Sequence, residues 1–324
     1  MKSEYLKGID NQPIQPESNS YGTLQSYSHY RLTFPNELTQ LTLSGNYILS
    51  ITDSYGTELF SRRFVVYTPQ VNVPAEVKRA RDLKYYDTQQ VVQFTINQKD
   101  FRLDNPQVAV KVAVLQNYRW DTAITRLKPQ YIIGNELVYR YDRETAFWAG
   151  NEYFYFDSKD IRVAASGIAR FTRDRLVGSY LFTNVSRANS VYTYYPDING
   201  DFLIITVNGA NPANEADYTQ VHFALEGKST FWGKEVYVYG KFSNYELRDE
   251  YKLTYDEKDG LFKGKVLLKQ GFYNYKFATK EGRTIDFNEI GGNFYQTENT
   301  YIILVYYRAP GALYDEVVGV GATK

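Results

Sequence analysis

Hydrophobic and polar residues alternate with a period of two along most of the chain, and this pattern predicts β-strands rather than helices. In GFYNYKF (271–277) the alternation places Tyr273, Tyr275 and Phe277 on one strand face, and burial in a sandwich is their simplest explanation. The same pattern recurs in VVQFTI, QVAVKVAVLQN, QYIIGNELVYRYD, NEYFYFD, DFLIITVN, DYTQVHFALEG, EVYVYGKF, YKLTYDEKDGLFKGKVLL and NTYIILVYYR.

Turn residues separate these segments. GNYILSITDSYGTELFSRRFVVY (45–67) predicts a hairpin whose turn begins at Asp53 and ends at Gly56, because Asp at the first place and Gly at the fourth suit a type I turn. DEKDG (256–260) predicts a second turn between strands. Strands at this spacing, with few convincing helical stretches, indicate an all-β protein built from sandwiches.

Two seams, defined here as candidate domain boundaries, divide the chain. YTPQVNVPAE (67–76) places two prolines after a finished strand, and NGANPANEA (208–216) is small and polar. We therefore expect an N-terminal immunoglobulin-like domain at 1–68, a central β-sandwich at 69–210 and a C-terminal sandwich at 211–324. EVYVYGKFSNYE (235–246), with the strand of 271–277, is typical of an early-set immunoglobulin-like sandwich similar to glycogen-binding modules.

The first domain holds about four predicted strands, whereas a free-standing sandwich of this type needs about seven. We expect that the sequence begins inside a domain whose first strands are missing. The alternative is that this segment packs on the middle domain and borrows its edge, since an exposed edge is a liability.

Charge and composition narrow the possible functions. Lys and Arg number 37, as do Asp and Glu, so no global field attracts nucleic acid or an anionic membrane. Cysteine is absent, which excludes a thiol nucleophile, a disulfide and a thiolate metal site. No apolar run is long enough for a membrane-spanning helix, and the start MKSEYLKGIDNQ lacks the apolar core of a signal peptide.

Catalytic motifs are scarce. His29 and His222 both stand in strand-like sequence, and neither belongs to a catalytic-triad or zinc motif. EGKST (226–230) ends like a phosphate-binding loop, but it lacks the first glycine and precedes a strand. Carboxylates in turns leave a glycosidase open as a third alternative, although two of them would have to face each other across a cleft. We expect no enzymatic activity, no cofactor and no metal.

Interaction with a protein partner has better candidates. Arg79 and Arg81 belong to the basic stretch EVKRARDLK (76–84), next to the first seam, and could contact an acidic partner. Trp120 and Trp148 adjoin turns or strand ends, as aromatic anchors of interfaces do, and Asn151 follows Trp148 closely. For each tryptophan the competing interpretation is a core residue of a sandwich.

Glycan binding is the alternative suggested by the C-terminal pattern. Such sites stack exposed aromatic rings on sugar, and Trp232 and Tyr245 are the candidate contacts. Tyr245 stands where glycan-binding relatives of this fold commonly carry Trp, which weakens the alternative.

Several long blocks resemble one family, the plug proteins of the type 9 secretion system of Bacteroidetes. The resemblance runs from Tyr5 to Asp315 and is carried by the following blocks: VKRARDLKYYDTQQVVQFTIN, NPQVAVKVAVLQNYRWDTAITRLKPQYIIGNELVYRYDRETAFWAGNEYFYFDSKDIR, YYPDINGDF, EADYTQVHFAL, LLKQGFYNYKF and GNFYQTENTYIILVYYR.

This resemblance implies a periplasmic, all-β accessory protein at the outer membrane. In that family the plug closes the periplasmic mouth of the translocon barrel through which folded cargo leaves the cell. No enzymatic activity, cofactor or small-molecule ligand is implied. Family members usually begin with a signal peptide and more of the first domain, from which this sequence departs.

Overall fold

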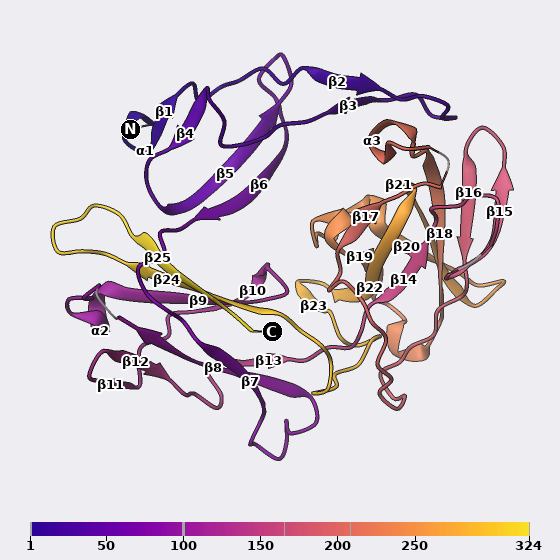
Figure 1. Ribbon diagram of the computed structural model, residues 1–324. Helices are drawn as coiled ribbons and strands as arrows, with labels where there is room; N and C mark the ends of the chain where they lie inside the picture. Colours follow the sequence, from indigo (N-terminus) through magenta and orange to yellow (C-terminus); the bar gives the residue numbers. More distant parts are fainter. Residues whose placement is uncertain (1, 99–100, 165, 208, 324) are drawn as a thin grey trace. The chain divides into compact units, whose positions relative to one another are not determined.

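The computed structural model describes residues 2–98, 101–164, 166–207 and 209–323 (Figure 1). The protein is all-β, as expected: the helices in the described ranges are three of four residues, α1 (Lys2–Tyr5), α2 (Pro106–Ala109) and α3 (Pro212–Glu215), and three short 3-10 turns. Two compact units are present. Unit 1 comprises Met1–Pro13, Leu32–Phe147 and Asn299–Lys324, and unit 2 comprises Ile14–Arg31 and Trp148–Glu298.

Unit 1 contains two larger sheets. One has the strand order β10-β9-β24-β25, and the other has the order β11-β12-β8-β13 with β7 also paired to β8. The strands are β7 (Ala75–Arg79), β8 (Gln89–Asn97), β9 (Val110–Gln116), β10 (Arg119–Thr125), β11 (Tyr131–Ile133), β12 (Glu136–Tyr139), β13 (Ala146–Trp148), β24 (Tyr301–Tyr307) and β25 (Glu316–Ala322).

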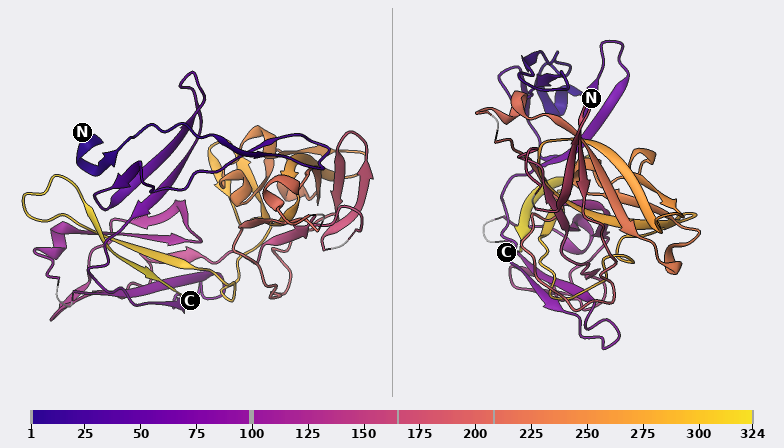
Figure 2. Two further views of the ribbon diagram at one scale, coloured as in Figure 1. Left: turned by 45° about the horizontal axis from the view of Figure 1, so that its top comes forward. Right: turned by 90° about the vertical axis from the view of Figure 1, so that its right-hand side faces the viewer.

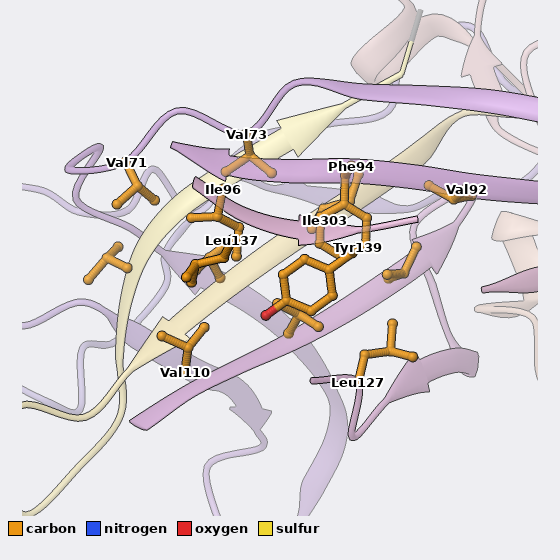
Figure 3. Packing of buried hydrophobic residues seen from close by; sticks show 14 of the residues in the cluster. Val71, Val73, Val92, Phe94, Ile96, Val110, Leu127, Leu137, Tyr139 and Ile303 are labelled. Atoms are coloured by element: carbon orange, nitrogen blue, oxygen red, sulfur yellow. The ribbon is translucent and has the colours of Figure 1, made fainter. Parts of the chain in front are cut away.

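Alternating residues of these strands build the core of unit 1. On β8 the side chains of Val92, Phe94 and Ile96 are buried, and Phe94 stacks on Tyr139 with ring centroids 4.4 Å apart (Figure 3). The cluster also contains Val71, Val73, Leu103, Val110, Val112, Val114, Leu127, Leu137, Phe147, Tyr301, Ile303, Val305, Tyr307 and Val318. Strands β8 and β24 therefore follow the alternation rule expected of sandwich strands.

The hydroxyl groups of two buried tyrosines in this core differ in their hydrogen bonding. No described residue binds the Tyr139 hydroxyl, whereas the Tyr301 hydroxyl donates to Gln90 Oε1 at 2.7 Å and accepts from Gln116 Nε2 at 3.0 Å. An unpaired buried hydroxyl carries a desolvation cost that phenylalanine would avoid. The pKa of the Tyr139 hydroxyl is raised by burial, in keeping with its apolar surroundings.

Tyr139→Phe should therefore leave the free energy of unfolding within about 0.5 kcal/mol of the wild-type value, or raise it. Tyr301→Phe is the matched control and should lower it by about 1–2 kcal/mol, because it removes the hydrogen bonds of the hydroxyl to Gln90 and Gln116. Denaturant unfolding followed by tyrosine fluorescence measures both. A larger loss in Tyr139→Phe than in Tyr301→Phe would contradict the assignment of the unpaired hydroxyl.

The N-terminal segment of unit 1 forms two small sheets of its own. They pair β1 (Leu6–Gly8) with β4 (Thr39–Leu41), and β5 (Gly45–Thr52) with β6 (Glu58–Val66). The second pair is the hairpin expected from the sequence, and its purple ribbons run side by side in both views of Figure 2. In its turn the Asp53 carboxylate accepts from the backbone N–H groups of Tyr55 and Thr57 at 2.9 and 2.8 Å.

This segment packs on the β9-β10-β24-β25 sheet. Val65 belongs to a cluster with Ala113, Trp120, Tyr306 and Val320. The Tyr306 hydroxyl donates to Asn46 Oδ1 at 2.9 Å. The segment thus packs on this sheet through side chains, and its strands β1, β4, β5 and β6 do not join the sheet.

Unit 2 is built on one ten-stranded sheet in its described residues. Its strand order is β14-β22-β19-β20-β21-β18-β16-β15, with β17 and β23 also paired to β22. The strands are β14 (Phe154–Asp157), β15 (Ile168–Arg173), β16 (Val177–Leu181), β17 (Phe202–Ile204), β18 (Tyr218–Glu226), β19 (Glu235–Tyr239), β20 (Lys252–Asp256), β21 (Leu261–Lys269), β22 (Gly271–Glu281) and β23 (Thr284–Asp286). Three 3-10 turns interrupt it: Ser229–Phe231, Lys241–Ser243 and Asp249–Tyr251.

The two ends of this sheet approach each other. Asp157 N, at the end of β14, donates to Ser166 O at 2.9 Å, two residues before β15 begins. The sheet is therefore nearly closed, like a barrel. The predicted strand face of Tyr273, Tyr275 and Phe277 is confirmed, since all three are buried in the core that this sheet encloses.

An arm, defined here as residues 14–31, belongs to unit 2 although the segments before and after it belong to unit 1. It carries β2 (Pro16–Asn19) and β3 (Ser28–Tyr30), which pair with each other. The buried Asp217 carboxylate holds the tip of the arm by accepting from Leu24 N at 2.7 Å and Gln25 N at 3.2 Å.

Tyr27 anchors the arm beside this carboxylate. Its hydroxyl donates to Ala216 O at 2.7 Å, and its ring meets that of Tyr218 edge to face with centroids 5.3 Å apart. The Lys269 ammonium lies 4.0 Å from the centre of the Tyr27 ring. Burial, together with the neighbouring Tyr218, Asp217 and Glu215, raises the pKa of Tyr27 to about 12.

The compact units do not follow the expected domain boundaries. Residues 148–207 join the sheet of the C-terminal half, because β14 and β17 pair with β22, and β16 runs parallel to β18. The last strands return to unit 1, where β24 pairs with β9. The polar stretch 209–216, which suggested a boundary, is instead a connection within unit 2 that contains α3.

Candidate interaction surfaces

Neither a cluster of metal-ligand side chains nor a membrane-spanning helix is found among the described residues. Among them, no group of three or more His, Cys, Asp or Glu side chains is placed to hold a metal ion. No helix in the same ranges combines the length and the apolar character needed to cross a bilayer.

Trp120 packs against other side chains of unit 1. It lies half-buried on β10, in the cluster that joins this strand to β6. The Arg63 guanidinium lies 4.8 Å from the centre of its ring, a cation–π arrangement. The packing of the N-terminal hairpin accounts for this tryptophan.

Trp148 and Asn151 have different environments. Trp148 ends β13 and is 48% exposed. Asn151 is buried: its Nδ2 donates to Gly291 O at 2.8 Å, and its Oδ1 accepts from Glu152 N at 2.8 Å. Asn151 therefore fixes the backbone of the loop that follows Trp148, while Trp148 itself keeps a surface that a partner could reach.

A buried polar cluster that sequence reasoning missed lies beside this loop. The Glu152 carboxylate accepts from the Tyr192 hydroxyl at 2.5 Å and from Glu298 N at 3.1 Å, and burial raises the pKa of Glu152. Arg187 donates to Glu152 O and lies 3.8 Å from the centre of the Phe154 ring. The residues are up to 146 positions apart, so no local sequence signal could have found them. Their contacts order the long segment between β16 and β17.

Arg79 and Arg81 are paired with carboxylates. Arg79 contacts Asp87 and lies over the Tyr86 ring, 3.4 Å from its centre. Arg81 pairs with Asp142 at 3.4 Å and remains largely exposed. Both arginines therefore have carboxylate counter-ions, which reduces the positive charge that they present to an acidic partner.

The two candidate glycan contacts do not form one platform. Trp232 is 65% exposed and lies before β19, whereas Tyr245 lies after it. The five residues of β19 span about 13 Å at about 3.3 Å per residue. Tyr245 is half-buried, and its hydroxyl donates to Asn199 O at 3.3 Å. Stacking of both rings on one short glycan is therefore not favoured.

An edge strand of unit 1 offers an apolar surface. In β11 the three side chains Tyr131, Ile132 and Ile133 are 59%, 46% and 63% exposed. In the described part of the chain β11 pairs with β12 alone. In the sequence, the apolar run before Gly134 and Asn135 predicts a strand. It does not predict that this strand lies at the edge of the sheet.

One comparison with known proteins names a family, and another finds a similar structure. Residues 1–68 match the family model described as the type 9 secretion system plug protein 1st domain. A crystal structure at 2.30 Å resolution of a hypothetical protein from Parabacteroides merdae ATCC 43184 is similar, with a TM-score of 0.94 and 34% sequence identity. The similarity covers 100% of this chain and 82% of that one. No curated protein matches the chain.

Proposed function

The chain belongs to the family of type 9 secretion system plug proteins, and from that premise we propose that it closes the periplasmic side of the outer-membrane translocon barrel by reversible protein–protein contacts. The protein acts there as a non-enzymatic accessory protein, in the periplasm and associated with the outer membrane. The observation that carries the proposal is the match of residues 1–68 to the first plug domain, supported by the similarity of the whole chain to the Parabacteroides merdae protein.

The physical demands on a plug fit the architecture. A barrel that passes folded proteins would leak small solutes when idle, so a stopper must be rigid and must bind reversibly. Packed β units supply the rigidity. Exposed apolar side chains are dispersed along the chain, and such surfaces favour moderate contacts over permanent ones.

We also propose that the units are immunoglobulin-like and that the C-terminal sandwich is of the early-set type. The support for this is the largely antiparallel pairing of the strands within the sheets of both units. We also propose that the family divides this chain into three domains, at 1–68, 69–210 and 211–324. This division differs from the two compact units.

We assign the β11 edge to the contact with the barrel. An exposed edge strand can accept a further strand from a partner, with backbone hydrogen bonds supplying affinity. The three exposed side chains of β11 would gain apolar contacts in the same event. Trp148 is a second candidate contact, because its ring is half exposed.

Binding of the full chain to the purified translocon barrel tests the function. Wild type should bind saturably, and Ile132→Lys should bind at least tenfold more weakly, since a lysine on an edge opposes strand addition. Leu313→Lys, in an exposed loop, is the matched control and should bind like wild type. Absence of binding by wild type would overturn the proposed function; equal binding by Ile132→Lys would overturn only the assignment to β11.

Solute leakage supplies an independent readout of plugging. Barrel reconstituted in vesicles should release a small dye, and added wild-type chain should slow that release. If the chain binds the barrel but release continues at the same rate, the protein is a partner of the barrel and not its plug.

A further inference from the structure

Four side chains from four neighbouring strands line up across the outer face of the unit 2 sheet. The register pairs Arg170 of β15 with Tyr180 of β16, Tyr180 with His222 of β18, and His222 with Lys265 of β21. We call this row the cation–aromatic stack. Figure 1 shows these strands adjacent in the sheet, with β15 and β16 forming a hairpin.

The first three members of the stack are in contact, and Lys265 lies next to His222 in the register. The rings of Tyr180 and His222 lie parallel, with centroids 4.0 Å apart and an interplanar angle of 5°. The Arg170 guanidinium lies 3.6 Å from the centre of the Tyr180 ring. Packing of the guanidinium on a flat ring holds its charge in a fixed place, which reduces the entropy lost when a ligand binds.

A glycine makes room for the rings. Gly178 precedes Tyr180 on the same strand face, and a Cβ atom there would lie 2.5 Å from Thr172 Oγ1 and 3.2 Å from Tyr180 Cε2. The Tyr180 ring therefore leans over Gly178. Next to it in the register are Gln220 and then Leu267, which is exposed.

Charge on this face is unbalanced at the stack. Of the neighbouring cations, Lys263 pairs with Asp256 and Asp259, and Lys252 pairs with Glu235. Within the described ranges neither Arg170 nor Lys265 lies within ion-pair distance of a carboxylate. The net charge of the chain is zero, so these two cations are a local excess, not part of a general one.

We propose that the cation–aromatic stack binds an acidic, extended segment of a partner protein. Neighbouring strands lie about 4.8 Å apart, so the row from β15 to β21 spans about 14 Å. An extended segment that crosses the strands places residues i and i+4 about 13 Å apart on one side. Two carboxylates at that spacing meet Arg170 and Lys265, while the chain between them covers the Tyr180 and His222 rings.

The surroundings favour a peptide over a phosphate group alone. Thr172 and Gln220 flank the stack with polar groups that can bind a peptide backbone. The exposed Leu267 side chain would be covered by a peptide, and a single phosphate would leave it in water. This inference concerns unit 2 and is independent of the assignment of β11 to the barrel.

His222 provides the reporter for the test. Burial, Lys265 and Arg170 all lower the pKa of its imidazole. A carboxylate bound between these cations opposes their effect, so the pKa of His222 should rise on binding. The chain contains one other histidine, His29, which lies on the arm beside Glu17 and serves as an internal control.

The experiment uses the full chain and a labelled Glu-Thr-Glu-Thr-Glu-Thr-Glu peptide, with the Gln-for-Glu peptide as control. Fluorescence anisotropy should show binding that weakens with added salt, and Arg170→Glu with Lys265→Glu should weaken it at least tenfold. Arg283→Glu reverses one charge, as each of these two substitutions does, at the β22–β23 turn of unit 2 and should have no effect. In NMR titrations the pKa of His222 should rise with the Glu peptide, while the peptide leaves the ring resonances of His29 in place.

Three outcomes would overturn the proposal. The Gln peptide could bind as tightly as the Glu peptide, Arg283→Glu could weaken binding as much as the double variant, or phosphatidylglycerol vesicles could bind the chain while the Glu peptide does not. The last result would assign the face to anionic lipid. Retention of the wild-type thermal transition in the double variant excludes unfolding as the cause of lost binding.

Discussion

Replacing Tyr275 by alanine should lower the free energy of unfolding of unit 2 by about 3–5 kcal/mol, the range for loss of a large aromatic side chain from a core. Tyr275 is 3% exposed and lies in the middle of β22. Its ring contacts four other rings, among them Phe223 at 5.1 Å and Phe277 at 5.7 Å between centroids. Removal leaves a cavity that the surrounding strands cannot close, because β22 is held by several neighbours in the sheet.

Tyr275→Phe separates the ring from the hydroxyl. The hydroxyl donates to Asn184 Oδ1 at 3.2 Å and accepts from Asn184 Nδ2 at 3.1 Å, so its loss should cost about 1 kcal/mol. Denaturant unfolding, with hydrogen exchange to assign the transition to unit 2, measures both variants. A loss in Tyr275→Ala no larger than in Tyr275→Phe would show that the ring contributes little to the core.

Asp217→Ala should release the arm from unit 2. The carboxylate binds Leu24 N, Gln25 N and Tyr218 N, the last at 2.8 Å, and alanine replaces none of these bonds. A hydrogen bond to a charged group contributes about 1.5–3 kcal/mol. Amide exchange at residues 20–27 should therefore accelerate at least tenfold, while exchange in β22 stays unchanged.

Tyr27→Phe is the control for this result. It removes the bond from the hydroxyl to Ala216 O but keeps the ring between Tyr218 and Lys269. We expect a smaller acceleration of exchange than in Asp217→Ala, and slower cleavage of the arm by a protease. Equal protection of the arm in wild type and Asp217→Ala would mean that the carboxylate does not hold it.

The surface residues show where prediction from sequence ended. Trp148 was expected next to a turn or strand end, and in the structure it ends β13 with a half-exposed ring. Asn151 was a candidate contact together with Trp148, yet its side-chain amide forms hydrogen bonds to backbone groups, one of them at Gly291. A residue three positions away in the chain can thus be buried while its neighbour is exposed, because contacts with a distant loop decide burial.

Local pattern by itself determined the all-β class, the hairpin turn at Asp53 and Gly56, and the buried face of Tyr273, Tyr275 and Phe277. These features depend on the period of a strand and on the φ angles that turn residues allow, both of which are local properties. The sequence blocks also carried the resemblance to the plug protein family.

Only the tertiary structure decided which strands share a sheet. The pairing of β14 with β22, the parallel pairing of β16 with β18 and the return of β24 to β9 join segments far apart in the chain. Many strands here have similar alternation, so the pattern leaves their partners open, and packing of the whole core selects among them. The same selection places Arg170, Tyr180, His222 and Lys265 side by side. No local sequence pattern predicts this proximity.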